Sequence, residues 1–187
     1  ISEAVLESGK VDFVVATDIS PLSLEKCKSL LADRFVGKYA CYATDGLKGV
    51  TEKPDEVFIA GMGGKEIISV LSALDYRPER LVLQPMKSAK ELREYLLKKG
   101  YGIEKDFMFF SLDKHYDVIV AVSELKTKPY TDDELKFGRD NLSGNNDFRR
   151  FLDIRISVIE KALKTAEQQE TKQNLQSELN ALKRLKL

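Results

Sequence analysis

Short apolar runs alternate with segments of helical periodicity along the first half of the chain. The runs that predict strands are 11–17, 38–43, 55–60 and 80–83. Helices are predicted between them, and each run ends at a turn rich in polar residues or glycine. Ser20 is a good N-cap and Pro21 a good first residue for the first of these helices, which should end near Phe35. Strands separated by helices need crossover connections, so a parallel sheet is expected.

Two further apolar runs, 103–112 and 116–124, follow the last of these helices with only residues 113–115 between them. So short a link leaves no room for a helix, and the two strands are expected to pair antiparallel. The predicted fold class is therefore α/β, with a Rossmann-like sheet that ends in an antiparallel hairpin. This outline is similar to that of the class I methyltransferases.

The last part of the chain has helical periodicity only. A polar linker, 126–130, leads to a capping box at Thr131 that starts a short helix. From Asp147 onward apolar residues recur at helical spacing, which is typical of a helical hairpin or a coiled coil. The predicted organisation is a Rossmann-like methyltransferase domain, 1–125, followed by a helical, coiled-coil-like domain, 126–187.

Composition limits the classes of protein that the chain can belong to. The 30 Lys and Arg residues balance 30 Asp and Glu residues, with a small basic excess after residue 125. This weak asymmetry does not establish a nucleic-acid partner, since patch geometry decides such binding. No apolar run is long enough for a membrane span and no signal peptide is visible, so the cytoplasm is expected. Cys27 and Cys41 are far apart in sequence and the chain has one histidine, so neither a zinc site nor a disulfide framework is indicated.

The turns after the first two predicted strands carry acidic residues. The carboxylate of Asp18 has acceptors for two ribose hydroxyls, and capping of the following helix is the structural alternative. Asp45 could accept a hydrogen bond from an adenine amine while Gly46 leaves room for the ring; an ordinary Asp-Gly turn is the alternative. In an open α/β sheet such turns lie at the carboxyl edge, where ligands bind.

A glycine cluster follows the third predicted strand. Gly61, Met62, Gly63 and Gly64 join that strand to an amphipathic helix, and glycine lets a ligand approach the backbone closely. Glu66 stands where a dinucleotide fingerprint has its third glycine, and the Gly-Lys-Ser/Thr of a P-loop is absent. A tight strand–helix joint is the alternative for this cluster alone. Together with the two acidic turns, the cluster predicts a nucleoside-binding site.

Several short motifs occur in a fixed order along the chain. They are Asp18-Ile19-Ser20, Thr44-Asp45-Gly46-Leu47, Ile59-Ala60-Gly61-Met62-Gly63-Gly64, Leu83-Gln84-Pro85 and Tyr116-Asp117-Val118-Ile119-Val120. Over residues 1–124 the chain thereby resembles the bacterial TrmK family of tRNA (adenine-22, N1)-methyltransferases. The resemblance implies S-adenosyl-L-methionine as cofactor, tRNA as partner and a helical C-terminal domain. Members of this family begin with a strand and an acidic, glycine-containing cofactor loop, and both are expected to be missing from this chain, which starts at Ile1.

The resemblance also implies residue roles. The expected cofactor-binding residues are Asp18, Ile19, Asp45, Gly46, Gly61, Met62 and Gly63. The expected substrate-binding residues are Gly64, Gln84 and Pro85, of which Gln84 is the better polar contact because proline has no backbone N–H. N1 of adenine has its own lone pair, so catalysis can rest on positioning, and no general base is assigned.

The target base must leave its stack before N1 is accessible, and contacts elsewhere on tRNA must offset that cost. The candidate RNA contacts are Lys87, Lys90, Arg93, Arg149, Arg150 and Arg155, with solvated helix faces as the alternative. A methyltransferase of the same fold for another RNA or a small molecule, and a non-catalytic RNA- or nucleotide-binding module, remain as alternatives. No metal is expected, and the oligomeric state is left open.

Overall fold

The computed structural model describes residues 1–186. The chain divides into two compact units, which are described separately below. The first unit comprises Ile1–Val57 and Ile68–Glu79, and the second comprises Phe58–Ile67 and Arg80–Leu187. The predicted boundary near residue 125 falls inside the second unit, and the division into domains 1–125 and 126–187 stays a prediction.

The first unit contains a two-stranded sheet and its flanking helices. The elements are α1 (Ser2–Glu7), β1 (Val14–Asp18), α2 (Pro21–Leu31) and β2 (Tyr39–Ala43). β1 and β2 are parallel, with Asp18 opposite Ala43, so both strands end at the same edge. The Ser20 side chain accepts the N–H of Ser23 and Pro21 is the first helical residue, as predicted for the start of α2.

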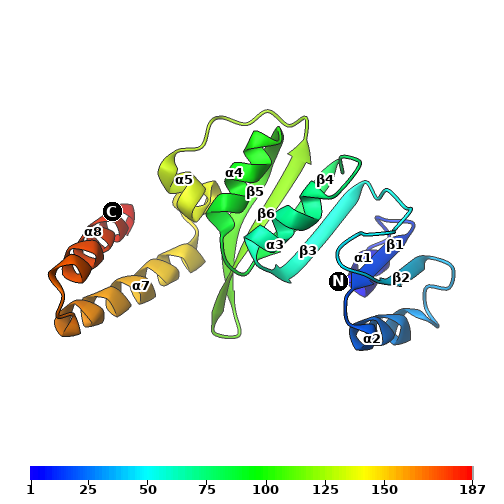
Figure 1. The fold of residues 1–187 in the computed structure, drawn as a ribbon, viewed down its shortest axis with the longest axis horizontal. Coiled ribbons are helices and arrows are strands. Elements are labelled where there is room, and N and C mark those ends of the chain that lie inside the picture. Colours follow the sequence, from blue (N-terminus) through cyan, green and yellow to red (C-terminus); the bar gives the residue numbers. More distant parts are fainter. Residues whose placement is uncertain (187) are drawn as a thin grey trace. The chain divides into compact units, whose positions relative to one another are not determined.

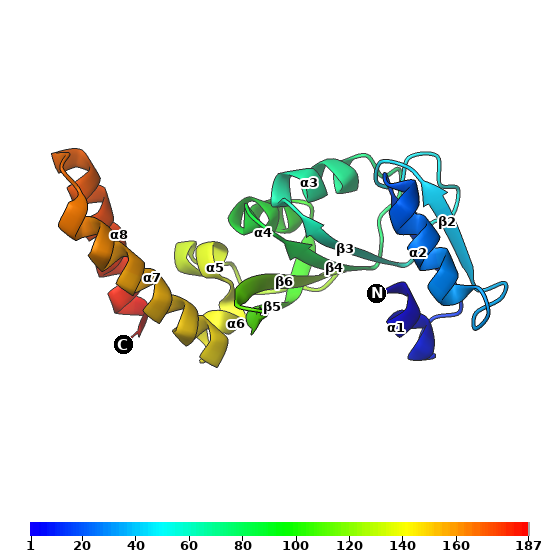
Figure 2. The ribbon, with the colours of Figure 1, turned by 90° about the horizontal axis from the view of Figure 1, so that it is seen from below.

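A four-stranded sheet follows along the chain. Its strands and the helices between them are β3 (Glu56–Met62), α3 (Gly64–Ser72), β4 (Arg80–Pro85), α4 (Ala89–Lys98), β5 (Tyr101–Ser111) and β6 (Lys114–Ser123). The strand order is β3-β4-β6-β5 (Figure 1). The N–H of Met86, just after β4, donates to the carbonyl of Met62 at the end of β3 (2.8 Å). The carboxyl ends of β3 and β4 therefore lie together, as in a parallel pair, and α4 covers one face of this sheet (Figure 2).

The strands form two sheets where the sequence predicted one. β1 pairs with β2, and β3 pairs with β4, but no ladder joins β1 to β3 within residues 1–186. A sheet continues only where the backbone groups of neighbouring strands meet. Which strands meet in this way is a tertiary property that apolar periodicity does not encode.

The antiparallel hairpin predicted at the end of the sheet is present, but its turn is shorter than expected. Ser111 pairs with Lys114, so Leu112 and Asp113 alone form the turn, and Lys114 and His115 belong to β6. Leu112 and Asp113 both have positive φ, +46° and +59°, the backbone geometry of tight hairpin turns that usually contain Asn or Gly. The prediction of a loop at 113–115 was wrong because the usual sequence signal for this turn is absent.

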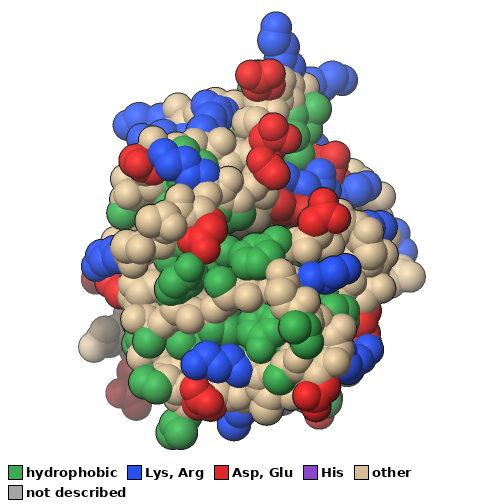
Figure 3. All heavy atoms as spheres, turned by 90° about the vertical axis from the view of Figure 1, so that its right-hand side faces the viewer, with side chains coloured by type: hydrophobic (Ala, Val, Ile, Leu, Met, Phe, Trp, Pro, Cys, Tyr) green, Lys and Arg blue, Asp and Glu red, His purple; other side chains and the backbone are tan. Residues whose placement is uncertain are grey.

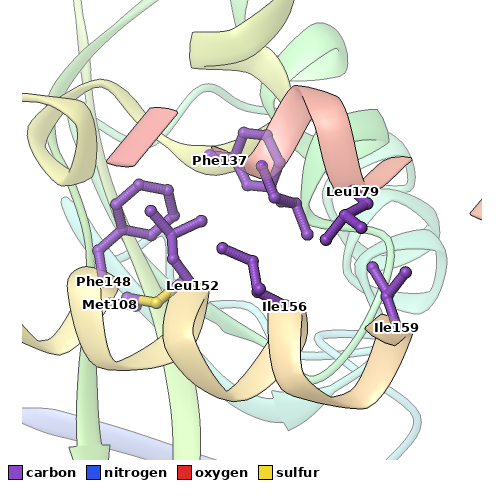
Figure 4. Close-up of a cluster of buried hydrophobic side chains, with 8 residues drawn as sticks. Met108, Phe137, Phe148, Leu152, Ile156, Ile159 and Leu179 are labelled. Carbon is purple, nitrogen blue, oxygen red and sulfur yellow. The ribbon is translucent and has the colours of Figure 1, made fainter. Parts of the chain in front are cut away.

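The remaining helices form one core with β5. They are α5 (Asp132–Phe137), α6 (Arg139–Leu142), α7 (Asn146–Thr165) and α8 (Gln169–Lys186). The capping box predicted at Thr131 is present. The buried core residues are Met108, Phe137, Phe148, Leu152, Ile156, Ile159, Leu179 and Leu182 (Figure 4). The predicted helical hairpin therefore packs its apolar faces together and against β5, and Leu187, at its end, lies outside the described residues.

Apolar side chains are also exposed on the first unit. Phe13, Leu22, Leu30 and Val36 are between 47% and 79% exposed. Figure 3 shows hydrophobic side chains gathered on the face at the right-hand side of Figure 1, among scattered charged residues. None of the described helices is both long and apolar enough to cross a membrane.

Candidate functional site

Asp18 lies exposed at the carboxyl end of β1. Its Oδ1 accepts a hydrogen bond from the backbone N–H of Ser20 (2.7 Å), the residue that caps the N-terminus of α2. Within residues 1–186 its Oδ2 has no hydrogen-bond partner, so the carboxylate keeps an oxygen for a ligand hydroxyl. The capping and ligand-binding interpretations of Asp18 are therefore compatible. Ile19 follows it with a side chain that is 75% exposed.

The turn after β2 lies next to Asp18. The N–H of Thr44 donates to the Asp18 carbonyl at 3.1 Å, which joins the two acidic turns at one edge of the β1–β2 sheet. The Asp45 carboxylate forms an exposed ion pair with Lys48 (2.6 Å). Gly46 has φ +65°, and a Cβ there would lie 3.1 Å from the methyl groups of Val70. The turn needs glycine for both reasons.

The glycine cluster meets Gln84 after β4. The N–H of Gly61 donates to Gln84 Oε1 at 2.9 Å, and Gln84 Nε2 lies 3.5 Å from the sulfur of Met86. Gln84 therefore holds the end of β3 with its oxygen, while its amide nitrogen faces a weak acceptor. Gly61 has φ +75° with nothing within 4 Å of its missing Cβ, so the space beside it is open. Pro85 ends β4 and is buried.

Gly63 and Gly64 are constrained differently. A Cβ on Gly64 would lie 2.3 Å from the Ser88 carbonyl oxygen, and the Gly64 N–H donates to the Lys87 carbonyl at 2.8 Å. Gly64 is therefore required by a close backbone contact, which is the tight-joint alternative. The atoms nearest to a Cβ on Gly63 would be those of the Glu66 carboxylate and the Lys87 side chain. The backbone N–H of Glu66 itself, together with the Lys87 ammonium, holds the pKa of the Glu66 carboxylate below its ordinary value.

The structure thus assembles the predicted residues in two groups. Asp18 and Ile19 lie beside Asp45 and Gly46 at the carboxyl edge of the β1–β2 sheet. The glycine cluster 61–64 lies beside Gln84 and Pro85 at the carboxyl edge of β3 and β4. Binding of one ligand by both groups stays a prediction.

One candidate RNA contact is wrong. Arg93 is fully buried, and its Nε donates to both carboxylate oxygens of Asp106 at 2.9 Å. Its Nη2 donates to Asp117 Oδ1 (3.1 Å) and its Nη1 to the Leu135 carbonyl (3.2 Å). Burial raises the pKa of Asp106 and of Asp117, and Arg93 opposes that rise.

This ion-pair cluster was missed in the sequence, although a signal was present. Asp106 and Asp117 interrupt apolar strand runs, and a buried carboxylate needs a charged partner. The other candidate cations are on the surface. Of these, Lys87 pairs with Glu66, Lys90 with Glu94 and Arg155 with Glu178.

Comparison with known proteins identifies the family. Residues 2–186 match the TrmK family, described as tRNA (adenine(22)-N(1))-methyltransferase. The chain belongs to the TrmK family. The family resemblance of the sequence motifs is therefore confirmed, and the match extends through the helices that follow the hairpin.

A known TrmK protein resembles part of the chain in sequence. The tRNA (adenine(22)-N(1))-methyltransferase of Bacillus subtilis (strain 168) is 37% identical over 81 residues, 41% of this chain and 34% of that protein. The matched part thus spans about a third of the length of this relative.

Two solved structures share the fold. The structure of M. capricolum TrmK in complex with S-adenosyl-homocysteine superposes with a TM-score of 0.85 at 20% identity, covering 98% of this chain and 84% of that one. A Streptococcus agalactiae protein of the NADB-Rossmann superfamily gives a TM-score of 0.86 at 22% identity, covering 99% and 84%. The predicted Rossmann-like α/β fold class is confirmed.

Proposed function

We propose that this protein transfers a methyl group from S-adenosyl-L-methionine to N1 of an adenine in tRNA, at position 22. The observation that carries the proposal is the match to the TrmK family over residues 2–186. The proposal makes tRNA the macromolecular partner and the cytoplasm the place of action.

The turns after β1 and β2 have the chemistry to hold the nucleoside part of the cofactor. The open Oδ2 of Asp18 is an acceptor for a ribose hydroxyl, and exposed Ile19 offers apolar contact beside it. Asp45 is an acceptor for the adenine amine if it exchanges the exposed Lys48 ammonium for the ligand. Because an exposed ion pair contributes only about 0–1 kcal/mol to stability, breaking the Asp45–Lys48 pair costs little free energy.

The glycine cluster and the end of β4 are proposed to face the reacting groups. Gly61, Met62 and Gly63 are the proposed contacts on the cofactor side, and the space beside Gly61 is open. Gly64, Gln84 and Pro85 are the proposed contacts on the target-base side. Gln84 is held in place by the Gly61 N–H, so its amide nitrogen can reach a base only by leaving the Met86 sulfur, a weak acceptor.

Positioning is the main contribution that this chain can make to the reaction. The bound cofactor would supply an electrophilic methyl group, and N1 of adenine brings its own lone pair. Oriented reactants can gain up to roughly 7–11 kcal/mol of barrier reduction without a general base. The residues proposed above therefore act by binding and orienting, and no proton transfer is assigned to any of them.

Methyl transfer to bacterial tRNA tests the proposal. Purified protein, S-adenosyl-L-methionine carrying a labelled methyl group and bulk tRNA are incubated, and the nucleosides are separated after digestion. We expect label in 1-methyladenosine, and none in a transcript whose adenine 22 is replaced by guanine. Label in another nucleoside would favour a different RNA specificity. Cofactor or tRNA binding without transfer would favour the non-catalytic module.

A further inference from the structure

The two cysteines of the chain face each other across α2 and β2. Leu24 and Leu31, the buried residues of α2, define the helix face that packs inward. Cys27 lies three residues after Leu24 and four before Leu31, so it shares that face. α2 packs against β1 and β2 (Figures 1 and 2). The helix therefore directs Cys27 toward the sheet.

Cys41 lies at the centre of β2 on the strand face that meets α2. Side chains alternate along a strand, so Tyr39 and Cys41 point to the same side. Both lie close enough to Lys28, on α2, to interact with its charge. The Cys27 side chain lies close enough to the Cys41 thiol to help raise its pKa, and both residues are half-buried free thiols. Two thiols on the facing sides of two packed elements are placed for cross-linking.

We propose that Cys27 and Cys41 form a reversible intramolecular disulfide when the protein meets a hydroperoxide. The Cys27 thiolate attacks one peroxide oxygen, which gives a sulfenic acid on Cys27 and releases an alcohol or water. The Cys41 sulfur then attacks the Cys27 sulfur, the S–S bond forms, and the sulfenic hydroxyl leaves as water with the Cys41 proton. Two thiols are oxidised and one peroxide is reduced, and a dithiol reductant reverses the change.

The surroundings of the two thiols set the order of attack. Burial, together with the neighbouring Cys27, raises the pKa of the Cys41 thiol to about 11. Cys41 is therefore almost wholly protonated at neutral pH and is a poor first nucleophile. This assigns the first oxidation to Cys27 and the resolving step to Cys41.

The cross-link would join two elements that flank the acidic turns. α2 begins just after Asp18, and β2 ends just before Asp45. A bond between the two elements restricts the unfolded chain more than the folded one. We expect the thermal midpoint of the oxidised protein to rise and to return to its starting value with dithiothreitol. This expectation does not depend on the proposed methyl transfer.

Mass spectrometry of the peroxide-treated full chain tests the proposal. Dilute protein is treated with hydrogen peroxide, alkylated and analysed without reduction. We expect the monomer to lose about 2 Da, the two thiol hydrogens, and a digest to contain the peptide pair joined through Cys27 and Cys41. A disulfide-linked dimer, or thiols that are oxidised further or stay free without the 2 Da loss, would overturn the proposal.

Two near-isosteric variants test the assigned order. Cys41→Ser keeps the first thiol and removes the resolving one, so it should accumulate a sulfenic acid that dimedone labels at Cys27. The wild type should show little of this label, because its sulfenic acid is consumed. Cys27→Ser should react with peroxide more slowly than Cys41→Ser. Equal labelling of wild type and Cys41→Ser would reject the resolving role of Cys41, whether or not the protein methylates tRNA.

Discussion

Single residues at the ends of β1 and β3 have structural roles that leave room for the binding roles proposed for them. Asp18 caps the approach to α2 with one carboxylate oxygen and keeps the other open. The Gly61 N–H donates a hydrogen bond to Gln84, and the space that a side chain at position 61 would occupy is open. For Asp18 the structural alternative considered from the sequence is true without excluding the proposed binding role.

Replacing Asp18 by alanine should weaken binding of S-adenosyl-L-methionine by about 1–3 kcal/mol, the value of a lost charged hydrogen bond. Asp18→Asn keeps an oxygen for the Ser20 N–H, so it should fold like the wild type while still binding the cofactor more weakly. Asp12→Ala, an exposed carboxylate before β1, is the matched control. Isothermal titration calorimetry measures all three, and unchanged affinity in both Asp18 variants would remove this residue from the site.

The two adjacent glycines of the cluster should respond differently to alanine. Gly64→Ala places a methyl group against the Ser88 carbonyl, which is backbone and cannot turn away, so a loss of about 1–3 kcal/mol of stability is expected. Gly63→Ala meets the flexible ends of Glu66 and Lys87, which can move, so its loss should be smaller. Urea unfolding measures the stability of both variants, and equal losses of stability would contradict the contacts described.

At the scale of elements, one buried arginine joins α4, β5, β6 and α5. Arg93 on α4 pairs with Asp106 on β5 and Asp117 on β6, and donates to the carbonyl of Leu135 in α5. A buried guanidinium is tolerated only when its ion-pair and hydrogen-bond partners are present. The cluster therefore sets how the helices after the hairpin meet the sheet.

Arg93→Met should lower the free energy of unfolding by about 3–5 kcal/mol, because it leaves the buried carboxylate of Asp106 and the partly buried carboxylate of Asp117 without their cation. Arg155→Met removes an exposed pair with Glu178 and should cost at most about 1 kcal/mol. Chemical denaturation at neutral pH compares the two variants. Similar small losses would show that the Arg93 cluster contributes little to stability.

The loss caused by Arg93→Met should also depend on pH. Burial raises the pKa of Asp106 and Asp117 in the folded protein, and Arg93 is the largest of the influences that lower it. When the folded state raises the pKa of a carboxyl group, the free energy of unfolding falls as pH rises toward and through that raised pKa. Without Arg93 the pKa is raised further, so this fall is larger. The difference in unfolding free energy between wild type and variant should therefore grow from about pH 4 to about pH 7. A constant difference across that range would argue against ionised carboxylates in the cluster.

At the scale of the whole molecule, the proposed contacts follow several different strands. The proposal assigns cofactor contacts to the turns after β1, β2 and β3. Hydrogen exchange with and without S-adenosyl-L-methionine should therefore show added protection in 17–20, 44–47 and 60–64. The segment 146–186 should be unchanged, since no cofactor contact is assigned to it. Protection confined to one of the three turns would contradict the proposed set of contacts.

The sequence alone determined the elements, their order and the family. Apolar periodicity marks the strands and the longer helices because burial demands it locally, and the caps at Ser20 and Thr131 follow from backbone groups that need nearby acceptors. The motifs from Asp18 to Asp117 identified the family because they combine turn chemistry with fixed order.

Only the tertiary structure decided which distant residues meet. The ion pair of Arg93 with Asp106 and the hydrogen bond from the Gly61 N–H to Gln84 join residues that lie far apart in the sequence. The division of the strands into two sheets is of the same kind. Such contacts depend on how elements pack, and packing is set by the shapes of all the neighbouring side chains together, which no local pattern along the chain records.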